Sequence, residues 1–163
     1  MKTAIGQDSH RFSDDENKPL LLASVKFDDA PALSGNSDAD VVLHALTNAV
    51  SGISGVNILG AVADQLCRQG ITDSRVYLQK ALDSLHPIRG TAYKITHVSI
   101  CMECQRPKIS AKIPLMRQKI AKLLNITQHD VGITATTGEG LTAFGRGEGI
   151  QVFVQVTAMP EIE

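Results

Sequence analysis

Three residues in the first third of the chain have the types and spacing of a metal site. Asp8 and His10 lie two positions apart in the opening stretch GQDSH, and His44 follows in a later apolar segment. Two imidazoles and one carboxylate, with a fourth position open, are the ligands of a catalytic zinc ion. Polar residues on an exposed loop would show the same pattern by chance. The hypothesis therefore depends on whether the fold brings the three side chains together.

The elements that carry these residues are predicted to be a strand and a helix. Residues 2–8 have the pattern of a first strand, and a helix is expected over about 39–52. Ser37 or Asp38 would be its N-cap, because short polar side chains accept the free backbone N–H groups of a first turn. The glycines expected to end the helix are Gly52 and Gly55. The end of a strand and the start of a helix can meet at one sheet edge.

This helix is predicted to have one buried and one exposed face. The buried face comprises Val42, Ala45, Leu46, Ala49, Val50 and Ile53. The other face comprises Asp40, His44, Thr47, Asn48 and Ser51. We therefore expect His44 to lie outside the core, one turn after Asp40.

The remaining segments complete an α/β (α+β) fold. They are a strand or hairpin at 19–27, helices at 72–85 and 112–125, and strands at 93–103, 130–136 and 149–158. Asp73 or Ser74 would start the second helix, and Asn125 suits the C-terminal cap of the third. The order β-β-α-α-β-α-β-β predicts a single domain over residues 1–163, a sheet with helices on one face.

Composition excludes several function classes. The net charge is −1, which gives no global attraction to nucleic acid or to an anionic membrane. The sequence shows neither a membrane span nor a secretory signal, so we expect a cytoplasmic protein. Three cysteines, an odd number, favour a reducing compartment over a disulfide scaffold. Cys101 and Cys104 form a C-x-x-C, but in a strand they would point to opposite faces, which argues against a redox pair.

Two further stretches have the composition of phosphate sites. Residues 134–150 are rich in glycine and threonine, so backbone N–H groups and hydroxyls can approach an anion, although a flexible hairpin would look the same. Within it, Arg146 and Glu148 are either a surface ion pair or a partner-facing site. Residues 105–114 are basic, and form either a solvated loop or the lip of a nucleotide site.

Together these stretches resemble the 2-C-methyl-D-erythritol 2,4-cyclodiphosphate synthase family. The match covers nearly the whole chain in the expected order. The matching motifs are Asp8-Ser9-His10-Arg11, the helix entry from Ser37 to Thr47, Arg106-Pro107-Lys108, and the run from Ala135 to Ile150. Four motifs in order are far more specific than any one of them.

The resemblance implies a homotrimer with active sites between adjacent subunits. The substrate would be 4-diphosphocytidyl-2-C-methyl-D-erythritol 2-phosphate, whose phosphate attacks the diphosphate and yields the cyclic diphosphate plus CMP. Asp8, His10 and His44 would bind zinc, and Glu139 would approach a magnesium or manganese ion at the diphosphate. Arg146 and Glu148 would lie near the threefold axis, where family members can hold an isoprenoid diphosphate.

The resemblance also assigns catalytic and binding roles. Asn36 and Thr137 would contact the transition state. The substrate-binding residues would be Asp8, Ser9, His10, Asn36, Ser37, Asn57, Ile58, Leu59, Cys104, Gln105, Arg106, Pro107, Lys108, Thr136, Thr137, Gly138, Glu139, Phe144 and Arg146.

The sequence departs from the family pattern in the part that holds the methylerythritol. The helix entry, usually His-Ser-Asp-Gly-Asp, reads Asn36-Ser37-Asp38-Ala39-Asp40. The family's Asp-Ile-Gly corresponds to Asn57-Ile58-Leu59, and the Phe-Pro-Asp-Thr-Asp stretch to residues 62–66. These departures keep two alternatives open: a non-catalytic trimer that binds metal and isoprenoid diphosphate, and a metal phosphohydrolase or altered-substrate cyclase.

Overall fold

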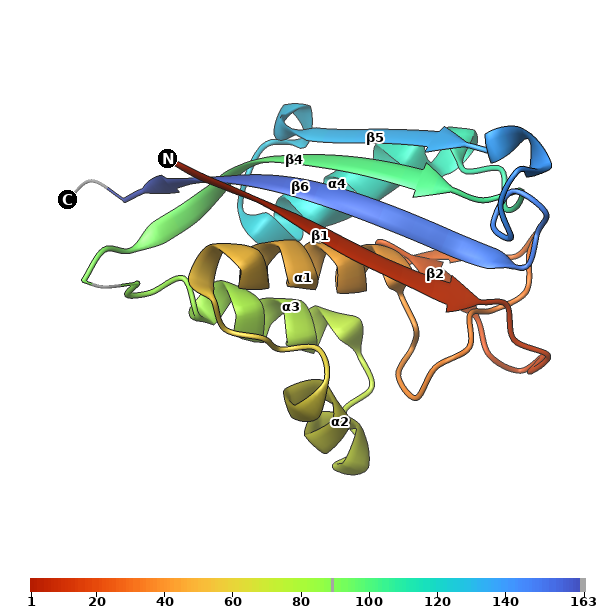
Figure 1. Cartoon of the computed structure of the whole chain (residues 1–163), viewed down its shortest axis with the longest axis horizontal. Helices are drawn as coiled ribbons and strands as arrows, with labels where there is room; N and C mark the ends of the chain where they lie inside the picture. The colour runs from red at the N-terminus through yellow and green to blue at the C-terminus, as the bar shows by residue number, and fades with distance from the viewer. Residues whose placement is uncertain (89, 162–163) are drawn as a thin grey trace.

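A four-stranded sheet forms one side of the molecule (Figure 1). The computed structural model describes residues 1–88 and 90–161. The strand order is β1-β6-β4-β5. β6 pairs antiparallel with β1 and with β4, whereas β4 and β5 are parallel. The strand bounds are β1 Lys2–Arg11, β4 Tyr93–Glu103, β5 Val131–Thr136 and β6 Gly149–Pro160.

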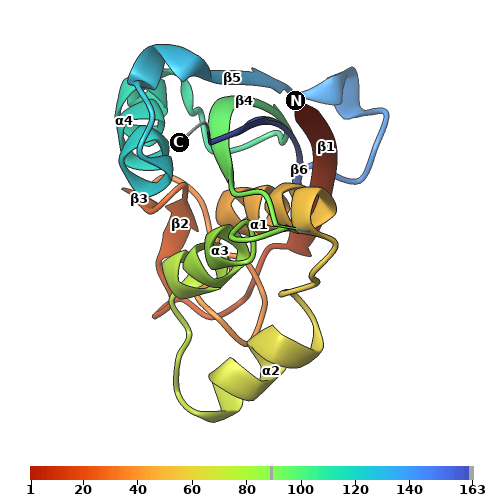
Figure 2. The same ribbon diagram turned by 90° about the vertical axis from the view of Figure 1, so that its left-hand side faces the viewer.

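The sheet is buried on one face only. In β4, Val98, Ile100 and Met102 are fully buried, whereas the alternate residues Ser99 and Cys101 are exposed. This period of two is what a strand with a helix layer on one side requires. Figure 2 shows that α1, α3 and α4 lie on the same side of the sheet, which confirms the predicted fold class. The helix bounds are α1 Val41–Ser54, α2 Ala61–Arg68, α3 Ser74–Asp83 and α4 Ile113–Leu124.

α1 is the central helix, and the prediction of an exposed face on it was wrong. Asp40, His44, Thr47 and Ser51 are all buried, and of the predicted polar face only Asn48 is partly exposed. The reason is the layer order: α1 packs on β1 and β6, and α3 covers its other side. A helix between two layers has little solvent face, so its polar residues must find partners inside the protein.

A glycine sets the distance between β1 and α1. A Cβ placed on Gly6 would overlap the backbone of Ala45 and Ala49 in α1. Only glycine lets the helix lie this close to the strand. The close approach brings the first turn of α1, with His44, to the strand that carries Asp8 and His10.

Several boundaries differ from the prediction. β1 continues to Arg11, because its last residues pair with the start of β6, Arg11 with Gly149. α1 begins at Val41 with Asp40 as its N-cap, so neither Ser37 nor Asp38 caps it, and it runs past Gly52 to Gly55. The segment 19–27 is a hairpin that forms a separate two-stranded sheet. Its strands are β2 Leu20–Leu22 and β3 Val25–Phe27.

α2 was not predicted from the sequence, whereas the other helices and strands were. α2 is short, has only Ala63 and Leu66 buried, and follows Gly60, which supplies no side-chain cap. In Figures 1 and 2 it lies beyond α3, away from the sheet. β4, Asp73 as the N-cap of α3 and Asn125 as the C-cap of α4 are confirmed. Short 3-10 turns occupy Ser110–Lys112, Gln128–Asp130 and Gly138–Gly140.

In the described part of the chain, the helices are too short or too polar to cross a lipid bilayer.

Candidate metal centre

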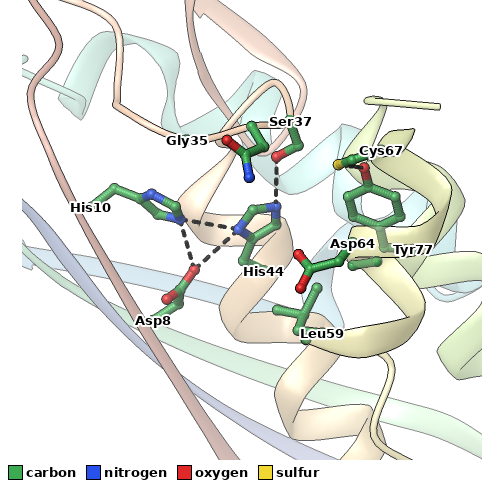
Figure 3. Close-up of a pocket in the computed structure, with 12 residues that line it drawn as sticks. Asp8, His10, Gly35, Ser37, His44, Leu59, Asp64, Cys67 and Tyr77 are labelled. Carbon is green, nitrogen blue, oxygen red and sulfur yellow. Dashed lines mark hydrogen bonds and ion pairs between the residues drawn. The ribbon is translucent and has the colours of Figure 1, made fainter. Parts of the chain in front are cut away.

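Asp8, His10 and His44 meet at one point in the structure (Figure 3). Asp8 and His10 lie two apart on β1 and therefore point to the same face. His44 comes from the first turn of α1. His10 Nε2 lies 3.0 Å from Asp8 Oδ2 and 3.1 Å from His44 Nδ1, and His44 Nδ1 lies 3.1 Å from Asp8 Oδ2. The three ligand atoms thus form a nearly equilateral triangle, and the predicted metal group is confirmed.

The triangle has the dimensions of three corners of a zinc site. A tetrahedral zinc ion with bonds of about 2.0–2.1 Å separates its ligand atoms by about 3.3 Å. The observed separations of 3.0 to 3.1 Å are slightly shorter, so an ion fits with a small outward shift of the ligands. Two nitrogens and one carboxylate oxygen are also the donor types that zinc prefers. The residues present can therefore hold this ion.

Each imidazole has one nitrogen directed at the triangle and the other at a protein oxygen. His10 Nδ1 lies 2.7 Å from the backbone oxygen of Ser34, which can only accept a hydrogen bond. The proton of a neutral His10 is therefore on Nδ1, and Nε2 offers its lone pair to a metal. His44 Nε2 lies 2.8 Å from Ser74 Oγ, which leaves Nδ1 facing the triangle.

Electrostatics keep the carboxylate of this group ionised. Burial opposes ionisation of Asp8, but its hydrogen bonds with His10 and His44 outweigh that effect and hold its pKa well below the usual range. Burial likewise opposes a charge on His10, yet the hydrogen bond with Asp8 outweighs it and raises the pKa of His10. A proton and a metal ion therefore compete for the lone pair of His10 Nε2.

A cavity of about 220 Å³ opens beside the triangle. The loop before α1 contributes Asn36 and Ser37, and the segment leading into α2 contributes Leu59. The structure thus brings these three predicted site residues next to the metal group. Further lining residues, which the predicted site did not include, are Gly35, Gly60, Ala63, Asp64, Cys67 and Tyr77. Figure 3 shows Asp64, Cys67 and Tyr77 on the side of the cavity opposite to Asp8.

The other predicted site residues in this part of the chain lie elsewhere. Ile58 is 5% exposed and belongs to the hydrophobic core. Asn57 is exposed within the loop between α1 and α2. Ser9 is exposed on the outer face of β1, opposite to Asp8 and His10. Their roles as substrate ligands stay predictions.

Two sequence segments form a second group at the ends of β4 and β5. The N–H of Cys104 donates to the carbonyl of Thr136 at 3.1 Å, and the N–H of Gln105 donates to the carbonyl of Phe144 at 3.2 Å. The hydroxyl of Thr142 donates to Glu103. These two segments hold the predicted residues Cys104, Gln105, Arg106, Pro107, Lys108, Thr136, Thr137, Gly138, Glu139, Phe144 and Arg146. The fold thus joins the two predicted phosphate stretches into one surface.

This second group lies apart from the metal triangle within one chain. The triangle is built on β1 and the first turn of α1, whereas the second group follows β4, an inner strand, and β5, the opposite edge strand. The second group approaches the end of β1 beyond the triangle, where the Arg106 guanidinium lies 5.1 Å from the centre of the Phe12 ring. Within the described residues, Glu139 and Thr137 are not among those that line the cavity beside the triangle.

Arg146 and Glu148 form an exposed ion pair. Arg146 Nε lies 3.5 Å from Glu148 Oε1, and Arg11 Nη1 lies 3.8 Å from Glu148 Oε2. The side chains of Arg146 and Glu148 are 54% and 47% exposed, so the pair adds little stability.

The two cysteines of the C-x-x-C point in opposite directions, as predicted. Cys101 is exposed on the outer face of β4, and Cys104 is buried. Burial raises the pKa of the Cys104 thiol to about 11, so it is protonated near neutral pH. The pair therefore lacks the geometry and the thiolate of a redox motif.

Comparisons with known proteins agree on one family. A family model described as the YgbB family matches residues 1–159. The 2-C-methyl-D-erythritol 2,4-cyclodiphosphate synthase of Chlamydia muridarum is 49% identical over 160 residues, which cover 97% of this chain and 88% of that protein. The bifunctional IspDF from Campylobacter jejuni superposes with a TM-score of 0.84 at 31% identity, over 99% of this chain and 42% of that one. IspF of Plasmodium falciparum, solved as a CDP complex, gives 0.83 at 25% identity over 99% and 97%.

Proposed function

The chain belongs to the YgbB family, and on that premise we propose that it is a 2-C-methyl-D-erythritol 2,4-cyclodiphosphate synthase. It converts 4-diphosphocytidyl-2-C-methyl-D-erythritol 2-phosphate to the 2,4-cyclodiphosphate and CMP, as a lyase of non-mevalonate isoprenoid biosynthesis. The observation that carries the proposal is the triangle of Asp8, His10 and His44 beside an open cavity, in a chain 49% identical to such a synthase.

The reaction is an intramolecular phosphoryl transfer. An oxygen of the 2-phosphate attacks the phosphorus that carries the methylerythritol, the new P–O bond closes the ring, and the bond to CMP breaks. No water is consumed and no covalent nucleophile is needed, so positioning and charge neutralisation dominate. When bound, zinc at Asp8, His10 and His44 and magnesium or manganese at Glu139 supply positive charge at the diphosphate.

The residues of the chain hold the substrate in the folded shape that this attack requires. Asn36 at the rim of the cavity donates amide hydrogens toward the phosphate oxygens, and Ser37 offers a hydroxyl. Thr137 and Glu139, in the second group, approach the same diphosphate from a neighbouring chain. Residues 104–108 hold the cytidine; the CDP bound by the Plasmodium falciparum relative supports a nucleotide site in this fold.

A homotrimer completes the site in this proposal. Two observations support it: the described residues of the second group do not line the cavity beside the metal triangle within one chain, and the outer sheet face carries large exposed apolar side chains. Ile5 is 70% and Phe153 46% exposed on that face, and such side chains suit a protein interface. Arg146 and Glu148 would hold an isoprenoid diphosphate near the threefold axis. A cytoplasmic location accords with three free cysteines.

Product analysis tests the function directly. The purified protein, loaded with zinc and magnesium, is incubated with the cytidine substrate and followed by phosphorus NMR. We expect equal amounts of cyclic diphosphate and CMP. Inorganic phosphate in place of the cyclic product would identify a phosphohydrolase instead. Substrate binding without turnover would favour the non-catalytic trimer, and either result overturns the proposal.

Light scattering tests the assembly. A homotrimer has about three times the 17.5 kDa mass of one chain. A monomer that still forms the cyclic product would overturn the shared-site arrangement while leaving the reaction in place.

A further inference from the structure

Ser74, the first residue of α3, connects the metal ligand His44 to a carboxylate. It is fully buried. Its Oγ lies 2.8 Å from His44 Nε2 and also forms a short hydrogen bond with Asp38 Oδ1. The backbone N–H of Ser74 donates to the other oxygen of Asp38 at 3.0 Å. Asp38 thus holds both polar groups of Ser74 at once.

The direction of each hydrogen bond in this chain follows from the groups involved. A carboxylate only accepts, so the single hydroxyl hydrogen of Ser74 is donated to Asp38. The Oγ then has only lone pairs left for His44, and His44 Nε2 must be the donor. The proton of the imidazole is therefore held on Nε2, and the lone pair of Nδ1 faces Asp8 and His10. This is the tautomer that metal binding at Nδ1 requires.

Asp38 is itself held in place by the backbone. Its N–H donates to the carbonyl of Thr72 at 2.9 Å, and the N–H of Asp40 donates to its Oδ1 at 3.2 Å. The loop before α1 and the loop before α3 are therefore fastened to each other at Asp38. The Asp38 carboxylate, the Ser74 hydroxyl and the His44 imidazole form a chain of hydrogen bonds that ends at the metal triangle.

A second serine lies near the same nitrogen but is a poorer partner. Ser37 Oγ is 3.4 Å from His44 Nε2, against 2.8 Å for Ser74, and it already accepts the N–H of Ala39 at 3.0 Å. Ser37 also lines the cavity and is partly exposed, whereas Ser74 is shielded from water. Ser74 is accordingly the stronger acceptor for His44.

We propose that Ser74, oriented by Asp38, is a positioning residue that fixes the tautomer and ring orientation of His44 for metal binding. The inference rests on the proposed function only through the metal site. The first residue of α3 thereby contributes to metal affinity as well as to the fold. Partners of this kind typically change metal affinity about 10–100-fold.

The test measures zinc affinity by competition with a chromophoric chelator, without turnover. In Ser74→Ala we expect the affinity to fall about 10–100-fold, and in Asp38→Asn to fall by a smaller factor. Ser74→Thr, which keeps the hydroxyl, should recover most of it. Ser51→Ala is the matched control: Ser51 is also buried, follows His44 on α1, and its hydroxyl lacks a partner in the described structure. It should leave the affinity unchanged.

Two further readouts separate positioning from a structural effect. The visible spectrum of the cobalt-substituted protein reports ligand geometry, and it should change in Ser74→Ala but not in Ser51→Ala. The melting temperature of the metal-free proteins reports the fold alone. Equal zinc affinities and cobalt spectra for parent and Ser74→Ala would overturn the inference, as would a loss in Ser37→Ala that Ser74→Ala does not show.

These measurements distinguish a wrong role for Ser74 from a wrong metal site. If the parent itself binds no zinc, the metal site is wrong, and the inference falls with it. If the parent binds zinc and the variant binds it equally well, only the role of Ser74 is wrong. If Ser74→Ala does not fold, Asp38→Asn and Ser74→Thr decide by the same measurements.

Discussion

The carboxylate of Asp40 accepts the backbone N–H of Ser24 at 2.6 Å, which fastens the turn between β2 and β3 to the start of α1. The same side chain accepts the N–H of Ala23 at 2.9 Å and caps α1 through Leu43 at 3.1 Å. Asp40 therefore holds the small two-stranded sheet against the helix that carries His44. Five predictions follow from this and from the other contacts of the site.

Asp40 should make the free energy of unfolding fall as the pH rises, whereas most carboxylates have the opposite effect. Complete burial raises the pKa of this carboxyl to about 6, although three backbone N–H groups oppose the shift. The folded state then holds a proton that the unfolded state releases, so the contribution is present below about pH 4 and is lost as pH rises through about 6. The loss is on the order of 2–3 kcal/mol.

The comparison that isolates this effect is between the parent and Asp40→Asn. Urea unfolding at about pH 4 and about pH 7 gives the free energy of unfolding of each protein. The advantage of the parent should shrink at the higher pH, because the amide does not titrate. A constant or growing difference would show that Asp40 is ionised throughout.

Ser24→Gly should stabilise the protein. Ala23 and Ser24 have φ angles of 54° and 60°, in the left-handed region that favours glycine. Relief of this strain is worth about 1–2 kcal/mol, less the roughly 0.5–1 kcal/mol that glycine loses in chain entropy. We expect a gain of about 0.5–1 kcal/mol in urea unfolding. Ser24→Ala, which keeps the Cβ, should show no such gain.

His44→Ala should remove zinc and activity together. It deletes one corner of the triangle, and two ligands do not hold the ion tightly. Metal analysis of the purified variant and product formation are the measurements, and full zinc occupancy with full activity would refute the assignment. In the parent, zinc affinity should also fall on acidification, because Asp8 and His10 must be free of protons to bind.

Gly6→Ala should push α1 away from β1. The new methyl group would overlap the backbone of Ala45 and Ala49, and such overpacking typically costs about 1–3 kcal/mol. Because His44 moves with α1, zinc affinity should fall as well. Gly132→Ala is the control, since a Cβ there meets only the Val98 carbonyl at 3.9 Å. Unaltered zinc affinity in Gly6→Ala would mean that the triangle tolerates this displacement.

Asn36→Ala should lower turnover much more than it changes KM. Asn36 lies at the rim of the cavity, and it is not the cap of α1, because Asp40 has that role. A single donor to a developing charge is typically worth about 10²–10³ in rate. Steady-state kinetics measure the effect, and Asn36→His should retain activity. Parent-like turnover in Asn36→Ala would remove this residue from the catalytic group.

The Asp8 and His10 half of the metal site was predictable because its pattern is local, whereas His44, 34 residues after His10, was assigned as the third ligand through the family resemblance. A D-x-H spacing in a strand places two side chains on one face, and a helix N-terminus after a turn brings the third. The last three residues of β1, Ser9 to Arg11, were missed because they have the polarity of a loop although they pair with β6. β4 was predicted with its observed bounds because its residues are β-rich and alternate in burial from His97 to Met102.

The remaining errors concern contacts between distant segments. The burial of His44, Thr47 and Ser51 depends on α3, which follows α1 only after a loop and α2. The bonds from Asp40 to Ala23 and from Ser74 to Asp38 join residues far apart in the sequence. Periodicity gives the faces of one element, and it does not say how many neighbours cover them.

The two walls of the cavity differ in how firmly the core holds them. α1, which carries His44, has eleven buried residues, whereas α2, which carries Asp64 and Cys67, has only Ala63 and Leu66. The wall that binds the metal is part of the hydrophobic core, whereas α2 in the opposite wall contributes only two buried residues to it. Substitutions in α2 can therefore change the shape of the cavity at little cost in stability, while the metal ligands on β1 and α1 keep their positions.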